Sequence, residues 1–241
     1  MTLSETPDEL APTFSSGMAD ATNYNNWIVA QFAPFIGSTV MEVGVGHGNF
    51  AKMILNHARR YVGVDIDPKL VEQAQAANPD HRYIVADVTS PQLAEETAGM
   101  GIDTILACNV LEHVAEDALA VRQLVASLPK GGHLLIYVPA FQALYNGMDR
   151  LAGHHRRYTR KSLAAIIPPE TGRIVSLSYV NPIGGLGWWV SGRLNPDIRE
   201  LDQVNGQIAF FDRYVFPVSR FLSPLFSRIF GQSLVCVVRR R

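Results

Sequence analysis

The sequence of 241 residues contains only two cysteines, Cys108 and Cys236, and both lie inside apolar runs. Two buried thiols in a chain of this length exclude a disulfide framework and favour a reducing compartment. The sequence lacks any uncharged apolar stretch of about 18 residues or more, so we expect no transmembrane helix. The first ten residues lack the basic start and apolar run of a signal peptide. These absences together predict a cytoplasmic protein.

The sequence also lacks an excess of either charge. It has 21 lysines and arginines against 22 acidic residues, a formal net charge of −1. No global field favours nucleic acid, and we expect no nucleic-acid partner. The length allows one large α/β domain with a lid or an insertion. The oligomeric state stays open.

Apolar runs alternate with segments of helical period from residue 39 to residue 139. The expected strands cover 39–43, 60–65, 81–86, 102–108 and 133–138, and the helices between them 49–59, 68–77, 90–98 and 111–128. With two later strands, at 172–179 and 233–238, this order predicts a Rossmann-like, seven-stranded, mostly parallel sheet with helices on both faces. Ligands of such sheets bind beyond the carboxyl ends of the strands, next to the first strand.

A glycine-rich turn follows the first expected strand, with Gly44, Gly46 and Gly48 at every second position. Glycine lets a ligand approach the backbone closely, so the turn is interpreted as a ligand cradle. A dinucleotide fingerprint requires glycine or alanine where this chain has Asn49, and no Gly-Lys-Ser/Thr phosphate loop follows.

Carboxylates follow the next two expected strands. Asp65 lies about 20 residues past the glycines, where a carboxylate suits two ribose hydroxyls. Asp87 can accept a hydrogen bond from an adenine amino group. Asp67 precedes Pro68, and we interpret it as a helix N-cap rather than a ligand contact.

Five segments in order resemble the motifs of class I S-adenosylmethionine (SAM)-dependent methyltransferases. They are Glu42-Val-Gly-Val-Gly-His-Gly48, Gly63-Val-Asp65, Ala86-Asp87-Val88, Cys108-Asn-Val-Leu-Glu-His113 and Leu128-Pro-Lys-Gly-Gly-His133. The resemblance implies SAM as cofactor and an N-terminal segment that covers it. The implied cofactor-binding residues are Tyr24, Glu42, Gly44, Gly46, Gly48, Asp65, Ile66, Asp87, Val88 and Asn109. The segments 153–158 and 184–189 resemble a bacterial subgroup that acts on small molecules and glycans, some members of which occur beside sugar transferases.

The acceptor substrate must be bound by residues outside these motifs. The segment from Tyr145 to Arg160 is rich in anion-binding groups and follows the fifth expected strand. We therefore expect a small anionic acceptor, namely a natural product, a sugar or a lipid-linked intermediate. The candidate substrate-binding residues are Tyr145, Arg156, Arg157 and Trp188, and the candidate catalytic residues are His113, His154, His155 and Tyr158. The alternative is that the arginines are solvated or pair with Asp149 and Glu170.

Glu112 has two interpretations. It is catalytic together with His113, or it favours the dipole in the first turn of the helix expected at 111–128. The spacing of the pair does not make a metal site, and we expect no metal. A general base is needed only if the acceptor must lose a proton before attack.

Three units are expected along the chain: an N-terminal arm and cofactor-covering helix (1–36), the Rossmann-like domain (37–180 and 232–241) and a helical lid (181–231). Pro217 and Pro224 are expected to break the helix at 210–230. Arg213, Arg220 and Arg228 share a face of that segment, which suits peripheral contact with a membrane. We favour the alternative, a lid packed on its own domain.

Two other functions compete with methyl transfer. The first is a non-catalytic SAM-binding regulator or partner subunit. The second is an NAD-dependent oxidoreductase, which Asn49 disfavours.

Overall fold

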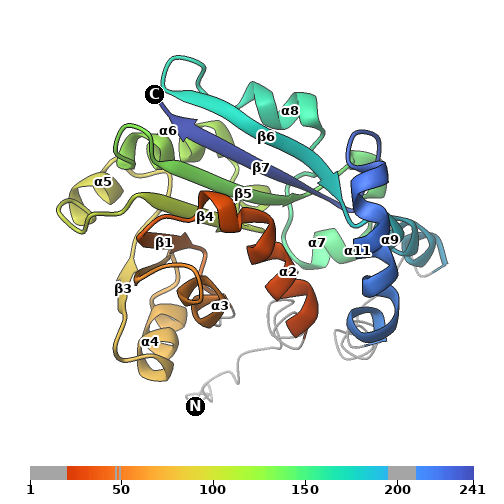
Figure 1. Cartoon of the computed structure of the whole chain (residues 1–241), viewed down its shortest axis with the longest axis horizontal. Coiled ribbons are helices and arrows are strands. Elements are labelled where there is room, and N and C mark those ends of the chain that lie inside the picture. Colours follow the sequence, from red (N-terminus) through yellow and green to blue (C-terminus); the bar gives the residue numbers. More distant parts are fainter. Residues whose placement is uncertain (1–20, 47, 49, 195–209) are drawn as a thin grey trace, which may run out of the picture.

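The computed structural model describes residues 21–46, 48, 50–194 and 210–241. One sheet of seven strands has the order β3-β2-β1-β4-β5-β7-β6 (Figure 1). The strands are β1 (Thr39–Val43), β2 (Arg60–Asp65), β3 (Arg82–Val85), β4 (Thr104–Cys108), β5 (His133–Pro139), β6 (Gly172–Val180) and β7 (Ser233–Arg240). The first five are parallel, and β7 is antiparallel to both β5 and β6. The predicted Rossmann-like, mostly parallel fold is confirmed.

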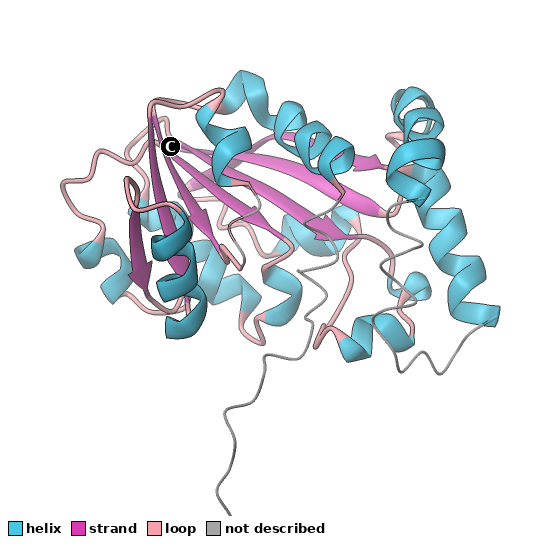
Figure 2. Cartoon of the chain, turned by 90° about the horizontal axis from the view of Figure 1, so that it is seen from below, coloured by secondary structure: helices cyan, strands magenta, loops and turns pink. Residues whose placement is uncertain are grey.

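Helices cover both faces of this sheet (Figure 2). One face carries α2 (Thr22–Phe32), α3 (Ala51–Leu55) and α4 (Pro68–Ala77), and the other α5 (Gln92–Glu96), α6 (Asp117–Ser127) and α8 (Arg160–Ala165). Short 3-10 turns form η1 (Ala33–Phe35), η2 (Leu111–His113) and η3 (Gln142–Leu144), and α7 (Gly147–Leu151) precedes α8. In the described ranges no helix has the length and apolar character needed to cross a membrane.

The hydrophobic core lies in two layers because successive side chains of a strand point to opposite faces. Met41 and Val43 of β1 belong to the layer that includes Leu124 of α6. Val40 of the same strand packs in the layer of Ile28 and other residues of α2. All five residues of β1 are buried, as expected for a central strand covered on both faces.

The helix expected at 111–128 is two elements. Val114 is extended, with φ −96° and ψ 119°, and it separates η2 from α6. The acidic residue in the first turn of α6 is therefore Asp117. The helix-dipole interpretation of Glu112 is wrong, because Glu112 lies in the separate turn η2. The helix expected at 49–59 is also shorter, since α3 covers only Ala51–Leu55.

Between β6 and β7, the described residues form three helical segments: α9 (Pro182–Leu194), the π-helical η4 (Phe211–Val215) and α11 (Phe216–Phe226). Figure 1 shows α9 and α11 side by side at one end of the sheet. Pro217 occupies the first turn of α11, where no backbone donor is required. Pro224 lies inside the helix near its end, so the expected break there is wrong. Residues 1–20 and 195–209, parts of the expected arm and lid, lie outside the described residues.

Helix α2 is joined to the segment that follows β6. The Asp212 carboxylate accepts hydrogen bonds from the backbone N–H groups of Asn23 (3.2 Å) and Tyr24 (2.7 Å), capping the start of α2. The Tyr24 ring packs edge-on against Phe216, and its hydroxyl lies 2.5 Å from that of Tyr137. Tyr24 is thus a core residue that docks α2, and the cofactor contact expected of it stays a prediction.

Candidate active site

The glycine loop turns sharply after β1. Gly44, Gly46 and Gly48 have φ values of +71°, +50° and +75°. The N–H groups of Gly44 and Val45 both donate to the carbonyl of Val64, at 2.8 and 3.2 Å. A Cβ atom on Gly44 would lie 2.5 Å from Cγ2 of Val110, so the loop packs directly on the segment that follows β4. His47 and Asn49 are outside the described residues.

Asp65 ends β2 and binds the glycine loop. Its Oδ2 accepts from the N–H of Gly46 at 3.0 Å, and its Oδ1 accepts from the N–H of Asp67 at 3.1 Å. A carboxylate has about four acceptor positions, so two remain for the hydroxyls of a ribose. Asp67 accepts from the N–H of Lys69 at 2.8 Å, which confirms it as the N-cap of α4.

The other predicted cofactor residues follow the neighbouring strands. Ile66, after β2, is 67% exposed and offers an apolar surface to a base. Asp87 and Val88 follow β3, and Asp87 accepts from the backbone and hydroxyl of Thr89. Asn109 follows β4 with a φ of +52°, and its N–H donates to the Tyr137 carbonyl. Because these strands are parallel, the residues meet at one edge of the sheet.

Glu42 lies one residue before the end of β1 and is buried. Burial raises the pKa of its carboxyl to about 8, against the opposing effect of a 2.5 Å hydrogen bond from the Tyr61 hydroxyl. Its predicted contact with the cofactor ammonium stays a prediction.

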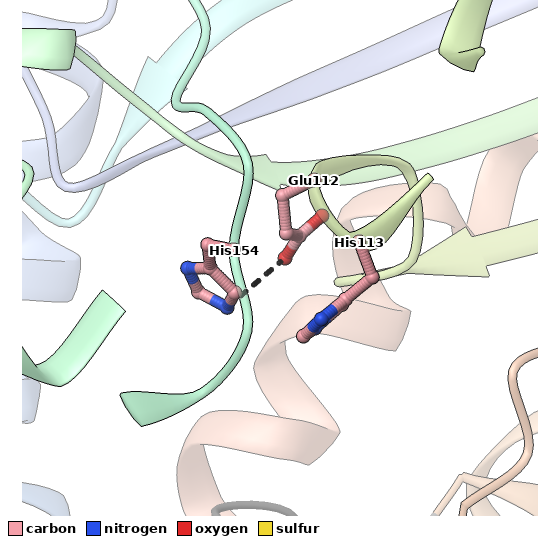
Figure 3. Close-up of side chains that lie close together, drawn as sticks. All are labelled: Glu112, His113 and His154. Atoms are coloured by element: carbon pink, nitrogen blue, oxygen red, sulfur yellow. Dashed lines mark ion pairs between the residues drawn. The ribbon is translucent and has the colours of Figure 1, made fainter. Parts of the chain in front are cut away.

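Glu112, His113 and His154 form a cluster beside this edge, which we call the Glu112 cluster (Figure 3). Glu112 and His113 belong to η2, and His154 comes from the segment between α7 and α8. The His113 and His154 rings meet edge-on with centroids 4.7 Å apart. Nε2 of His154 lies 4.0 Å from Oε1 of Glu112.

Glu112 is fully buried, and neither of its carboxylate oxygens has a hydrogen-bond partner in any other described residue. This burial raises the pKa of Glu112 to about 8. Although His113 is partly exposed, desolvation of its ring and the nearby His154 lower its pKa to about 4, so its imidazole is neutral at physiological pH. The His155 side chain is exposed, and its backbone N–H donates to the backbone carbonyl of Glu112 at 2.8 Å.

His154 is held by a buried carboxylate. Its Nδ1 lies 2.8 Å from Oδ1 of Asp149, and Nε of Arg157 donates to the same oxygen at 2.7 Å. Burial alone would raise the pKa of Asp149, but the hydrogen bonds from His154 and Arg157 lower it. The Tyr145 hydroxyl donates to the His154 carbonyl at 2.7 Å, so Tyr145 supports the cluster through the backbone.

The two arginines expected to bind an anionic acceptor are paired within the chain. Arg157 is buried against Asp149, and the Trp188 ring lies 4.9 Å from its guanidinium carbon. Arg156 pairs with Asp117 at 2.9 Å. The anion-binding role of Arg156 and Arg157 is therefore corrected to ion pairing, of which the Asp149 pair had been anticipated as the alternative.

Tyr158 is also corrected. It is 2% exposed. Its hydroxyl oxygen lies 2.8 Å from Oδ2 of Asp117 and 3.0 Å from the carbonyl oxygen of Leu111, and both of these oxygens are acceptors. The Tyr158 hydroxyl holds the first residue of η2, Leu111, and is buried away from any substrate. Neither the burial of Glu112 nor the contact of Asp149 with His154 leaves a local signal in the sequence.

Comparison with known proteins shows that this chain is similar to methyltransferases. Residues 41–134 match the family described as "Methyltransferase domain". An "Uncharacterized methyltransferase" of Mycobacterium sp. (strain KMS) is 33% identical over 162 residues, which cover 64% of this chain and 62% of the relative. A "Trans-aconitate 2-methyltransferase" of Enterobacter sp. (strain 638) is 28% identical over 202 residues, covering 73% of this chain and 75% of that protein.

Solved structures agree on the fold. A SAM-dependent methyltransferase from Archaeoglobus fulgidus has a TM-score of 0.60 at 13% identity, covering 91% of this chain and 94% of its own. The N-methyltransferase NodS from Bradyrhizobium japonicum WM9, solved with S-adenosyl-L-homocysteine, has a TM-score of 0.51 at 13% identity, covering 99% and 93%. The predicted cofactor class, SAM, agrees with the matched family and fold. Residues 41–134 therefore match a methyltransferase domain, and the chain has the fold of solved SAM-dependent methyltransferases.

Proposed function

We propose that the chain is an enzyme that transfers the methyl group of SAM to a small-molecule acceptor. The supporting observation is the close approach of Gly44 in the glycine loop to Val110, the residue before η2, which supports a position of the Glu112 cluster beside the cofactor. A lone pair of the acceptor attacks the methyl carbon, and the carbon–sulfur bond breaks. Its electron pair goes to sulfur, leaving S-adenosylhomocysteine, and the proton of the acceptor goes to water. Alignment of the reactants supplies most of the catalysis.

The acceptor belongs to the classes expected from the sequence: a natural product, a sugar or a lipid-linked intermediate. The Enterobacter relative is named for methylation of trans-aconitate, a small acid, which supports an anionic acceptor. The ion pairs of Arg156 with Asp117 and of Arg157 with Asp149 give no support to an anionic acceptor. We also propose a cytoplasmic location, in keeping with the two cysteines, which are free and buried.

The function is tested by calorimetric titration with SAM and with NAD, followed by incubation with methyl-labelled SAM and bacterial extracts. We expect binding of SAM alone and transfer of label to a small molecule in the aqueous or lipid fraction. Heat-treated protein serves as the control. Binding of NAD without SAM would refute the proposal. SAM binding with no labelled product in either fraction would favour the regulator or partner-subunit alternative.

We further propose that α11 and α9 rest on an anionic membrane surface. Helix α11 buries Phe216 and the small residues Ser219 and Ser223, whereas Phe221 and Leu225 are 78% and 71% exposed. The exposed apolar group, which we call the lid surface, consists of Leu186, Trp189, Leu194, Val218, Phe221, Leu225 and Ile229. This orientation opposes the favoured interpretation of a lid whose apolar face packs on its own domain.

Charge favours a bilayer as the partner of the lid surface. Arg213, Arg220 and Arg228 are exposed along the same segment, and basic residues beside an exposed apolar helix face suit anionic headgroups. A groove of about 850 Å³ between α2 and α11 is lined by Trp27, Phe216, Arg220 and Phe221 among others. Such a groove suits the apolar portion of a lipid-linked acceptor.

Vesicle co-sedimentation tests this surface. We expect the protein to bind vesicles containing phosphatidylglycerol, with weaker binding at high salt because the arginine contribution is screened. A Phe221→Glu/Leu225→Glu variant should lose more than about tenfold in affinity, since burial of each side chain contributes about 1.5–3 kcal/mol. Val175→Glu, which alters a 42% exposed apolar residue of β6, is the matched control. The proposal would be contradicted if the Phe221→Glu/Leu225→Glu variant bound vesicles as tightly as Val175→Glu. Concentration-dependent dimerisation through the lid surface without vesicle binding would also contradict it.

A further inference from the structure

The buried carboxyl group of Glu112 has no hydrogen-bond partner in the other residues that the structure describes. A buried polar atom without a hydrogen bond costs about 1–3 kcal/mol, and more when charged. Both Glu112 oxygens are in this state with respect to the other described residues. The two imidazoles of the cluster are not within hydrogen-bond distance of Glu112. Nε2 of His154 lies 4.0 Å from Oε1 of Glu112. A cation between the three side chains would satisfy the carboxylate.

His154 has the outer contact of a metal ligand. A metal-bound histidine almost always donates its other ring N–H to a carboxylate or a backbone carbonyl, which fixes the ring and its tautomer. Nδ1 of His154 meets Asp149 at 2.8 Å, which leaves Nε2 directed at Glu112. The His113 ring lies beside Gly153, where an added Cβ atom would be 3.9 Å from its Nδ1. Arg157 neutralises Asp149 and holds it in place.

We propose that Glu112, His113 and His154 bind one divalent transition-metal cation, of which Zn²⁺ is the best match. Two histidines and one glutamate form the protein ligand set of known catalytic zinc sites, in which a fourth position stays open. Mg²⁺ and Ca²⁺ prefer oxygen ligands and fit this set poorly. The ligand atoms now lie within 4.8 Å of one another, and tetrahedral Zn²⁺ needs separations of about 3.3 Å. Side-chain rotations at His113 and His154 can close that difference.

The inference rests on the proposed function and specifies its acceptor. With the cation in place, the fourth position would be open to one oxygen ligand from the acceptor. A bound cation lowers the pKa of a coordinated hydroxyl, so the acceptor would give its proton to water and attack as an oxyanion. The site therefore favours an acceptor with a hydroxyl group, and methylation at oxygen. This departs from the expectation of no metal, which rested on the spacing of Glu112 and His113 alone.

Calorimetry on the chelator-treated full chain tests the site with Zn²⁺, and with Mg²⁺ for comparison. We expect one Zn²⁺ per chain and much weaker binding of Mg²⁺. Glu112→Gln and His154→Gln should each weaken Zn²⁺ binding at least about tenfold, the lower limit of losses seen even for outer-shell changes. Co²⁺ provides a second readout, because its visible absorption band should lose intensity in both variants. His57→Gln, which removes an exposed histidine remote from the cluster in sequence, should leave both measurements unchanged.

Two outcomes would overturn the proposal: no stoichiometric Zn²⁺ binding by the folded chain, or equal affinity in wild type, Glu112→Gln and His154→Gln. Circular dichroism verifies that the variants are folded. Replacing the unpartnered Glu112 by the neutral, isosteric glutamine puts little stability at risk. SAM titration of the same metal-free samples separates this result from the methyltransferase proposal. Retained SAM binding without a zinc site would remove the metal and leave the proposed function standing.

Discussion

Replacing Asp65 with alanine should weaken SAM binding by at least about 100-fold. The carboxylate is anchored by the N–H groups of Gly46 and Asp67, which leaves acceptor positions directed at a ribose. Hydrogen bonds to a charged group contribute about 1.5–3 kcal/mol each, so the loss of two corresponds to about 3–6 kcal/mol. Calorimetric titration of wild type and variant with SAM measures the difference.

Asp67→Ala is the matched control for this experiment, because Asp67 is an acidic residue of the same loop that caps α4. It should lower the free energy of unfolding by about 1 kcal/mol and leave SAM affinity nearly unchanged. A 2′,3′-dideoxy analogue of S-adenosylhomocysteine sharpens the test. Removing the hydroxyls should reduce affinity for wild type and have little effect on Asp65→Ala. An undiminished SAM affinity in Asp65→Ala would refute the ribose assignment.

Arg157→Gln should destabilise the fold far more than Arg156→Gln, although the two arginines are adjacent in the chain. The Arg157 side chain is 2% exposed and pairs with the fully buried Asp149. Removing one partner of a buried ion pair costs about 3–5 kcal/mol, since the other charge stays buried. The Arg156 side chain is 34% exposed, and a pair at the surface contributes about 0–1 kcal/mol. Equilibrium urea unfolding gives both free energies.

The double variant Asp149→Asn/Arg157→Gln is the control for the buried pair. With both charges removed, no uncompensated ion remains, and part of the lost stability should return. A cost for Arg157→Gln as small as that for Arg156→Gln would show that Asp149 is not held as a buried carboxylate. In that case the support for His154, and with it the geometry of the Glu112 cluster, would need revision.

The sequence by itself was sufficient to predict features that depend on residues close together in the chain. The strands at 39–43 and 60–65 were placed to the residue, because short β-branched and apolar segments bounded by turn residues are a local signal. Asp67 was identified as an N-cap because capping depends on residues within one helical turn. The positions of the glycine loop and Asp65 follow from strand order, since parallel strands bring their carboxyl ends to one edge.

The tertiary structure decided what the acceptor side contains. His154 meets Glu112 only because the segment after α7 folds back against η2, and no periodicity links residues so far apart in the chain. The same folding buries Arg157 on Asp149, although composition gives adjacent arginines the same character. Helix α11 directs Ser219 and Ser223 inward and Phe221 outward, because Asn181 bonds to both serines. The cofactor loop is thus a property of local sequence, whereas the acceptor site, the proposed metal site and the lid surface exist only through long-range contacts.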